Sequence, residues 1–262
     1  MPRSRVLIIA SVVIVVAVAF GGFYVYDQVL RGDNVAALSL PSTAPGAAAS
    51  SAPAATSSSS DPTTTASTGA AASVSSGGAT GDVAGTWTVA TGSQAGYRVT
   101  EQLANLPAQS DAVGRTDKVT GTITVTSSGS TTTLTAADLT VDTTSISSDK
   151  SQRDNRLRSE GLQTDTYPTA TFKLTQPVAV PAAAVTGTPS DITLTGDLTL
   201  HGTTKSVQIP AKAQLVNGTV SVAGSLTFPL SDFGMTAPNI GGFIVSIADH
   251  GTLEFVVNFS KG

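Results

Sequence analysis

The stretch TGDLTLHGTTKSVQIP, residues 195–210, decides the fold of this chain. Leu198 and Leu200 alternate with polar residues, His201 and Gly202 interrupt the alternation, and the alternation resumes toward Ile209. An apolar period of two is typical of a half-buried strand, and a glycine between two such runs is typical of a tight turn. The stretch therefore predicts a β-hairpin that contains one of the 2 histidines of the chain.

The same period of two recurs after Trp87, where apolar residues alternate with threonine and serine. Three runs share one pattern: 119–125, 192–200 and 220–228. Each run has a glycine on its apolar face, at Gly121, Gly196 and Gly224 respectively. A glycine weakens a strand interior unless the sheet bends sharply there or another backbone comes close. We therefore expect a sheet that curls on itself.

Almost all of the remaining pattern in this part of the chain is also that of strands. Further strands are expected at 86–89, 97–103, 131–141, 171–178, 205–215 and 243–259, the last one broken near His250. The apolar face changes between Leu134 and Leu139, which predicts a bulge at Ala136-Ala137. Only residues 151–160 have a helical pattern, with Asp149 or Ser151 as the N-cap. An all-β sheet of this size hides its edges in a sandwich or a closed barrel, and the bending glycines favour the barrel.

The N-terminal residues predict a membrane helix. Residues 6–26 carry no charge, and at ~1.5 Å per residue they span roughly 30 Å, the thickness of a bilayer core. Arg3 and Arg5 precede this run, which places residues 1–5 in the cytoplasm and the rest of the chain outside the cell membrane. We expect a single-pass, uncleaved signal anchor. The alternative is a signal peptide cleaved after Ala17-Val18-Ala19, which would give a secreted protein.

Residues 27–81 are predicted to be a disordered linker between this helix and a folded domain at residues 82–262. From 41 to 80 every residue except Asp61 and Val74 is Ser, Thr, Ala, Pro or Gly. Such a composition buries too little apolar surface to offset the entropy lost on ordering. The linker would let the domain move far from its anchor.

Composition excludes several classes of function. The net charge of −4, with no run of Lys and Arg after the membrane helix, argues against binding nucleic acid. The chain has no cysteine, and His201 and His250 lack metal-ligand spacing. We predict no catalytic residue, no metal site and no cofactor other than a bound lipid. A hydrolase would need one of these two histidines as its base, and each fits a turn better.

Residues 148–172 concentrate the charge of the domain around the predicted helix. One interpretation is a solvent-exposed helix face with salt bridges. The other is a lid across the barrel mouth, in which Leu157 is a plug and Arg153 and Arg156 contact a polar head group.

Three segments carry a resemblance to a known family. They are RDNRLRS at 153–159, TYPTATF at 166–172 and GDLTLHGTTKSV at 196–207, and in this order they resemble the YceI-like family. The resemblance covers residues 87–262, although Asn155 stands where many members have His and Gly161-Leu162 where an aromatic pair is frequent. It implies an eight-stranded antiparallel, lipocalin-like barrel whose apolar lumen holds a polyisoprenoid or similar lipid, without known catalysis.

Inward-facing residues of the expected strands are the predicted lipid contacts. They are Tyr97, Ile123, Val125, Phe172, Leu194, Leu198, Leu200, Val222, Leu226 and Phe228. We therefore expect a membrane-anchored, extracytoplasmic protein that stores or transports an isoprenoid-type lipid. The alternative is a structural or interaction barrel of the cell envelope that its own side chains fill. The sequence leaves open which lipid binds and whether the protein forms a homodimer.

Overall fold

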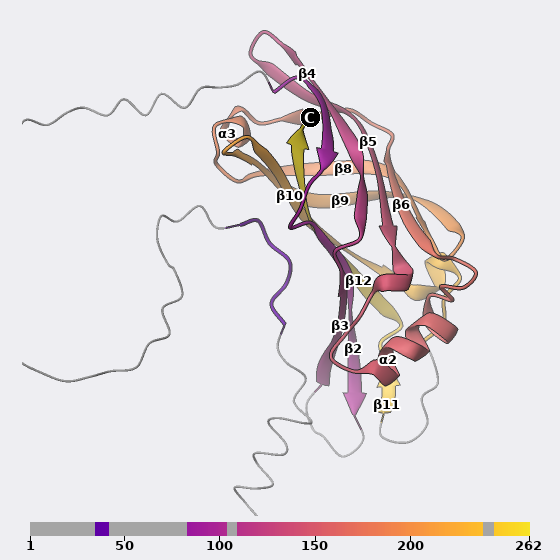
Figure 1. Ribbon diagram of the computed structural model, residues 1–262. Helices are drawn as coiled ribbons and strands as arrows, with labels where there is room; N and C mark the ends of the chain where they lie inside the picture. The colour runs from indigo at the N-terminus through magenta and orange to yellow at the C-terminus, as the bar shows by residue number, and fades with distance from the viewer. Residues whose placement is uncertain (1–34, 42–82, 104–108, 238–243) are drawn as a thin grey trace, which may run out of the picture.

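The computed structural model describes residues 35–41, 83–103, 109–237 and 244–262 (Figure 1). The predicted membrane helix at 6–26, and the predicted linker apart from 35–41, lie outside these residues. No helix in the described ranges is long and apolar enough to cross a membrane.

Twelve strands form one sheet that closes into a barrel. They are β1 (Gly85–Val89), β2 (Gln94–Leu103), β3 (Gln109–Thr116), β4 (Val119–Ser128), β5 (Thr131–Asp142), β6 (Thr169–Leu174), β7 (Val178–Val180), β8 (Ser190–Leu200), β9 (Thr203–Val216), β10 (Thr219–Pro229), β11 (Ile244–Ile247) and β12 (His250–Lys261). Eight of them follow one another around the wall in the order β1-β4-β5-β6-β8-β9-β10-β12, and β12 pairs with β1 to close the ring. The predicted eight-stranded antiparallel barrel is confirmed.

The other four strands continue strands of the ring across short breaks. β1 and β2 pair with successive parts of β12, and β4 and β3 pair with β1 and β2. In the same way β6 and β7 pair with successive parts of β5, and β11 and β12 pair with successive parts of β2. The break between β11 and β12 confirms the one predicted near His250. Strand β3 was not predicted, because its inward positions Ser110, Ala112 and Gly114 are small and give no apolar period.

The glycines of the three similar runs lie where a neighbouring strand comes very close. A Cβ atom on Gly121 would lie 2.1 Å from the carbonyl oxygen of Asp138, and one on Gly196 would lie 2.4 Å from that of Lys173. At Gly224 the nearest carbonyl oxygen would be 2.7 Å away. Side chains therefore do not fit at these positions, which supports the interpretation that the glycines permit close approach of the curled sheet.

The predicted bulge lies one residue from its expected position. Thr124 of β4 pairs with Ala136 of β5, and Val125 pairs with Leu134, so that Thr135 is the extra residue. This extra residue explains why the apolar face of β5 changes along the strand.

The predicted helix at 151–160 is α2 (Ser151–Arg156), which continues as the π-helical turn η3 (Leu157–Gly161). Its N-cap residue is Lys150, without a side-chain cap. The predicted cap was wrong, because Asp149 forms an ion pair with Arg153 instead. The shorter turns are η2 (Thr143–Ser145), α3 (Ala182–Val185) and η4 (Leu230–Phe233). Figure 1 shows α2 beside β11 at one end of the barrel, with the C-terminus toward the other end.

The close approach at Gly196 yields a stability test. We expect Gly196→Val to lower the free energy of unfolding by at least ~1 kcal/mol, because its side chain would overlap the backbone of β6. Urea unfolding measures this change. Thr193→Val is the matched control, since Thr193 lies on the same strand and is exposed; its effect should stay within ~0.5 kcal/mol. An unchanged free energy for Gly196→Val would mean that this glycine has no geometric role.

Candidate ligand-binding cavity

A cavity of about 810 Å³ occupies one end of the barrel. Strands β2, β3 and β12 line it together with α2, η3 and the segment around η4. Apolar side chains of the lining include Val99, Ala112, Val141, Ile146, Leu230 and Met235. The exposed residues Ser151, Gln152, Arg156 and Thr236 also line the cavity. They mark its opening to solvent, which we call the mouth.

A buried ion pair lies under the helix at this end. Glu101 of β2 is only 4% exposed. Its carboxylate accepts hydrogen bonds from Nε of Arg153 at 3.4 Å and from Nη2 at 3.2 Å. Arg153 also donates to Asp149. Because a bidentate pair has a defined geometry, this contact holds α2 over the cavity in one orientation.

Two carboxylates contact the guanidinium of Arg153. Burial alone would lower the pKa of Arg153, but the hydrogen bonds and negative charge of Glu101, followed by those of Asp149, raise it above its usual value. The guanidinium therefore stays charged. Since two carboxylates already contact it, Arg153 is not a free cation waiting for an anionic ligand.

Tyr97 brings a hydroxyl group to the cavity. It lies on β2 and faces inward, and among the described residues its Oη atom has no hydrogen-bond partner although that atom is buried. Burial raises the pKa of Tyr97 well above its usual range, and the nearby Asp154 and Glu101 add to the rise while Arg153 opposes it. The phenol therefore remains a protonated donor. A buried donor without a partner is costly, and a ligand with an acceptor group would remove that cost.

The ten predicted lumen residues divide into two groups. Tyr97, Leu200 and Phe228 line the cavity, as do Arg153, Arg156 and Leu157 of the predicted lid. Ile123, Val125, Phe172, Leu194, Leu198 and Val222 lie in the packed core, and Leu226 packs against it. The cavity therefore does not extend along the whole barrel, because bulky side chains such as Trp87 and Phe259 fill the end opposite the mouth. The part that each of the ten plays in binding a ligand stays a prediction.

Sequence reasoning missed several residues of the cavity. Glu101 has the same parity along β2 as Tyr97 and Val99, and this signal could have identified it. Ala112 lies on the unpredicted strand β3, and Ile146 and Met235 lie in connecting segments without an apolar period.

The two histidines lie away from the cavity lining in the described part of the chain. His201 is in the β8–β9 turn with φ 50° and its Nδ1 atom is 3.1 Å from the carbonyl oxygen of Phe233. This contact makes Nδ1 the donor, because a carbonyl can only accept. His250 is exposed beside Asp249. Over the ranges that the structure describes, no group of three His, Cys, Asp or Glu residues could hold a metal ion.

Part of this chain is similar in sequence to curated proteins. Protein YceI of Escherichia coli is 41% identical over 76 residues, which are 29% of this chain and 36% of that protein. A UPF0312 protein of Pseudomonas paraeruginosa is 38% identical over 105 residues, 37% of this chain and 50% of the relative. The matches thus span only a third to a half of these curated relatives.

A solved structure has the same fold. It is a polyisoprenoid binding domain from Saccharophagus degradans implicated in plant cell wall breakdown, with a TM-score of 0.50 and 19% identity, and the match covers 68% of this chain and 99% of that one. The family model of the YceI-like domain matches residues 87–259. That match includes the whole ring of strands apart from its two ends, and the chain belongs to the YceI-like family.

Proposed function

We propose that this protein binds an isoprenoid-type lipid in its cavity and stores or carries it at the cell envelope. The observation that carries the proposal is a largely apolar cavity of about 810 Å³ with one open end. Its volume falls within the ~300–1,000 Å³ typical of small-molecule sites. An apolar chain gains roughly 25 cal/mol for each Å² that it buries. The description of the Saccharophagus degradans domain as polyisoprenoid binding supports the same class of ligand.

The polar groups around Tyr97 favour a neutral head group at that point of the cavity. Tyr97 offers a hydrogen-bond donor, while the charge of Arg153 is already matched by Glu101 and Asp149. A hydroxyl or carbonyl oxygen can accept from Tyr97 without disturbing these pairs. A phosphate would add negative charge beside two carboxylates, which costs free energy in a partly buried site.

Membrane anchoring is part of the proposal. The uncharged run at 6–26 and the preceding Arg3 and Arg5 support a single-pass anchor with the barrel outside the cytoplasm. Cleavage after Ala19 would instead release the same barrel. We propose no catalytic step, because Glu101 and Arg153 of the cavity are paired with each other and His201 serves a turn.

The proposed ligand is tested by identifying any lipid that co-purifies with the protein from its own host. We expect native mass spectrometry to detect a bound lipid, and Leu200→Glu to abolish it, because a carboxylate in the cavity wall must be desolvated or keep the cavity wet. Thr199→Lys is the control, since Thr199 is on the opposite face of β8. Circular dichroism must show that both variants keep their strands. An empty native barrel in repeated preparations would favour the structural role instead.

The head-group contact has its own test. We expect Tyr97→Phe to weaken binding of geranylgeraniol about tenfold, the effect of one hydrogen bond of ~1.4 kcal/mol. Binding of a hydrocarbon of the same length should not change. The free energy of unfolding of the empty protein should stay equal or rise, because the substitution removes a buried hydroxyl that has no partner in the described structure. Isothermal titration calorimetry measures both ligands, and equal losses for the two would refute the contact.

Topology is tested with protease added outside intact cells that lack their wall. Cleavage is expected within residues 41–80, and denaturing electrophoresis should show a fragment of roughly 180 to 220 residues. Full protection of a linker shown to carry no modification would place the barrel in the cytoplasm.

A further inference from the structure

The outer wall of the barrel has a buried patch that the lumen does not explain. Val113, Ala223 and Val256 are 7%, 7% and 8% exposed, yet their sequence neighbours on β3, β10 and β12 are the residues that face inward. Glu254 lies on the same outer face of β12 and is 2% exposed. Outer positions of a soluble barrel normally contact water, so this patch requires a cover.

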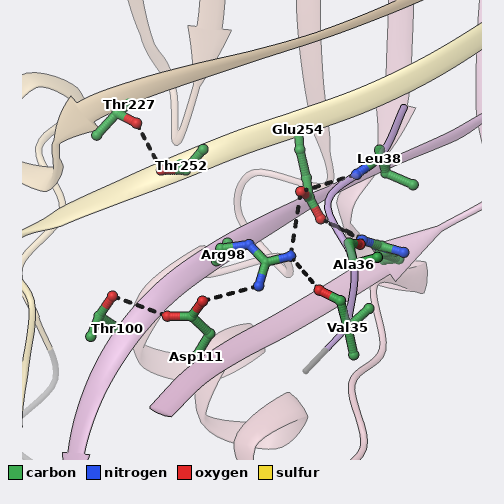
Figure 2. Close-up of polar contacts among 10 residues, drawn as sticks. Val35, Ala36, Leu38, Arg98, Thr100, Asp111, Thr227, Thr252 and Glu254 are labelled. Carbon is green, nitrogen blue, oxygen red and sulfur yellow. Dashed lines mark hydrogen bonds and ion pairs between the residues drawn. The ribbon is translucent and has the colours of Figure 1, made fainter. Parts of the chain in front are cut away.

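The cover that the structure describes is residues 35–41 of the predicted linker. The amide of Leu38 donates to Oε2 of Glu254 at 3.4 Å, and Arg115 donates to the carbonyl oxygen of Ala36. Arg115 also pairs with Oε1 of Glu254 at 2.8 Å, and Arg98 approaches Oε2 at 3.7 Å. Figure 2 shows Leu38 and Ala36 beside Glu254 and Arg98. The buried carboxylate is thus satisfied jointly by the wall and by the segment.

The two ends of the segment fix its direction. Nη2 of Arg98 donates to the carbonyl oxygen of Val35 at 2.7 Å, and Nε2 of Gln214 donates to that of Pro41 at 3.1 Å. Arg98 is paired with Thr252 of β12, a residue that lines the cavity.

Gln214 lies at a level farther from the mouth. It is paired with Ser221, and Ser221 is paired with Asn258, six residues beyond Thr252 along β12. The segment therefore runs along the outer wall with residue 35 toward the mouth and residue 41 toward the packed end.

From this docking we infer that residues 35–41 shorten the connection between the membrane anchor and the barrel wall, and that this contact turns the mouth of the barrel toward the membrane. The inference rests on the proposed anchor at 6–26. With the segment docked, only residues 27–34 join the anchor to the barrel wall, and they reach at most roughly 30 Å. The 56 residues from 27 to 82 would otherwise reach roughly 200 Å. A docked segment thus keeps the mouth near the bilayer surface, where an apolar ligand would enter or leave.

Docking can be measured without a membrane. Leu38 and Leu40 are half-buried, whereas Ala36 and Ala37 are exposed. We expect Leu38→Ser/Leu40→Ser in the full chain to speed amide hydrogen exchange over residues 36–40 at least about tenfold. Ala36→Ser/Ala37→Ser should leave it nearly unchanged. Native exchange as fast as that of an unstructured peptide, or equal exchange in both variants, would overturn the docking.

Orientation is measured in vesicles of phosphatidylcholine and phosphatidylglycerol that contain a head-group quencher. Because the chain has no cysteine, single Thr236→Cys and Ser128→Cys variants can carry a fluorophore at the mouth and at the β4–β5 turn. We expect several-fold stronger quenching at position 236, and loss of the difference when Leu38→Ser/Leu40→Ser is added. Equal quenching in the otherwise native chain would overturn the orientation. Failure of the chain to remain with washed vesicles would refute the anchor itself, and hydrogen exchange would still decide the docking.

Discussion

Closure of the sheet is the constraint on which the rest of this structure depends. An open antiparallel sheet leaves unpaired N–H and C=O groups along two edges, and pairing of β12 with β1 joins the two ends of the eight-stranded ring. Eight strands around the ring set a lumen that side chains can just fill or that admits one small ligand. The curl brings neighbouring backbones within reach of one another, which is why Gly121 and Gly196 have no room for a side chain.

The size of the inward residues decides where the lumen is filled. Around the packed end they are large, as at Trp87 and Phe259, whereas Ala95, Ala112 and Ala170 line the cavity. Alanines leave space that bulky residues would occupy, and helix α2 covers this space without filling it. One barrel therefore combines a solid core, which supplies the stability of a chain without disulfides, with a cavity at the mouth.

Much of this architecture can be predicted from period-two patterns, because an inward face of leucine, valine and isoleucine leaves a clear signal in strands such as β8. The signal fails at the cavity, because β3 has inward serine, alanine and glycine and therefore no apolar period. Alternation along a strand predicts that a residue such as Leu198 faces inward. It does not predict whether an inward residue lines the cavity or packs in the core. Likewise, the composition of residues 27–81 could not predict docking at 35–41, because that contact depends on Glu254, distant in sequence.

Strand β2 links the two covers of the barrel. Its inward Glu101 is paired with Arg153 of α2, and its outward Arg98 contacts both Glu254 and the backbone of Val35. Removing one member of a buried ion pair costs more than the pair contributes, because a charge is left without compensation. Arg153 of helix α2 pairs with Glu101, and the amide of Leu38 donates to Glu254. The helix and residues 35–41 therefore each contribute a contact to a buried carboxylate of the wall. Arg98 and Glu101 are three residues apart, so one short part of β2 at the mouth contacts both helix α2 and residues 35–41.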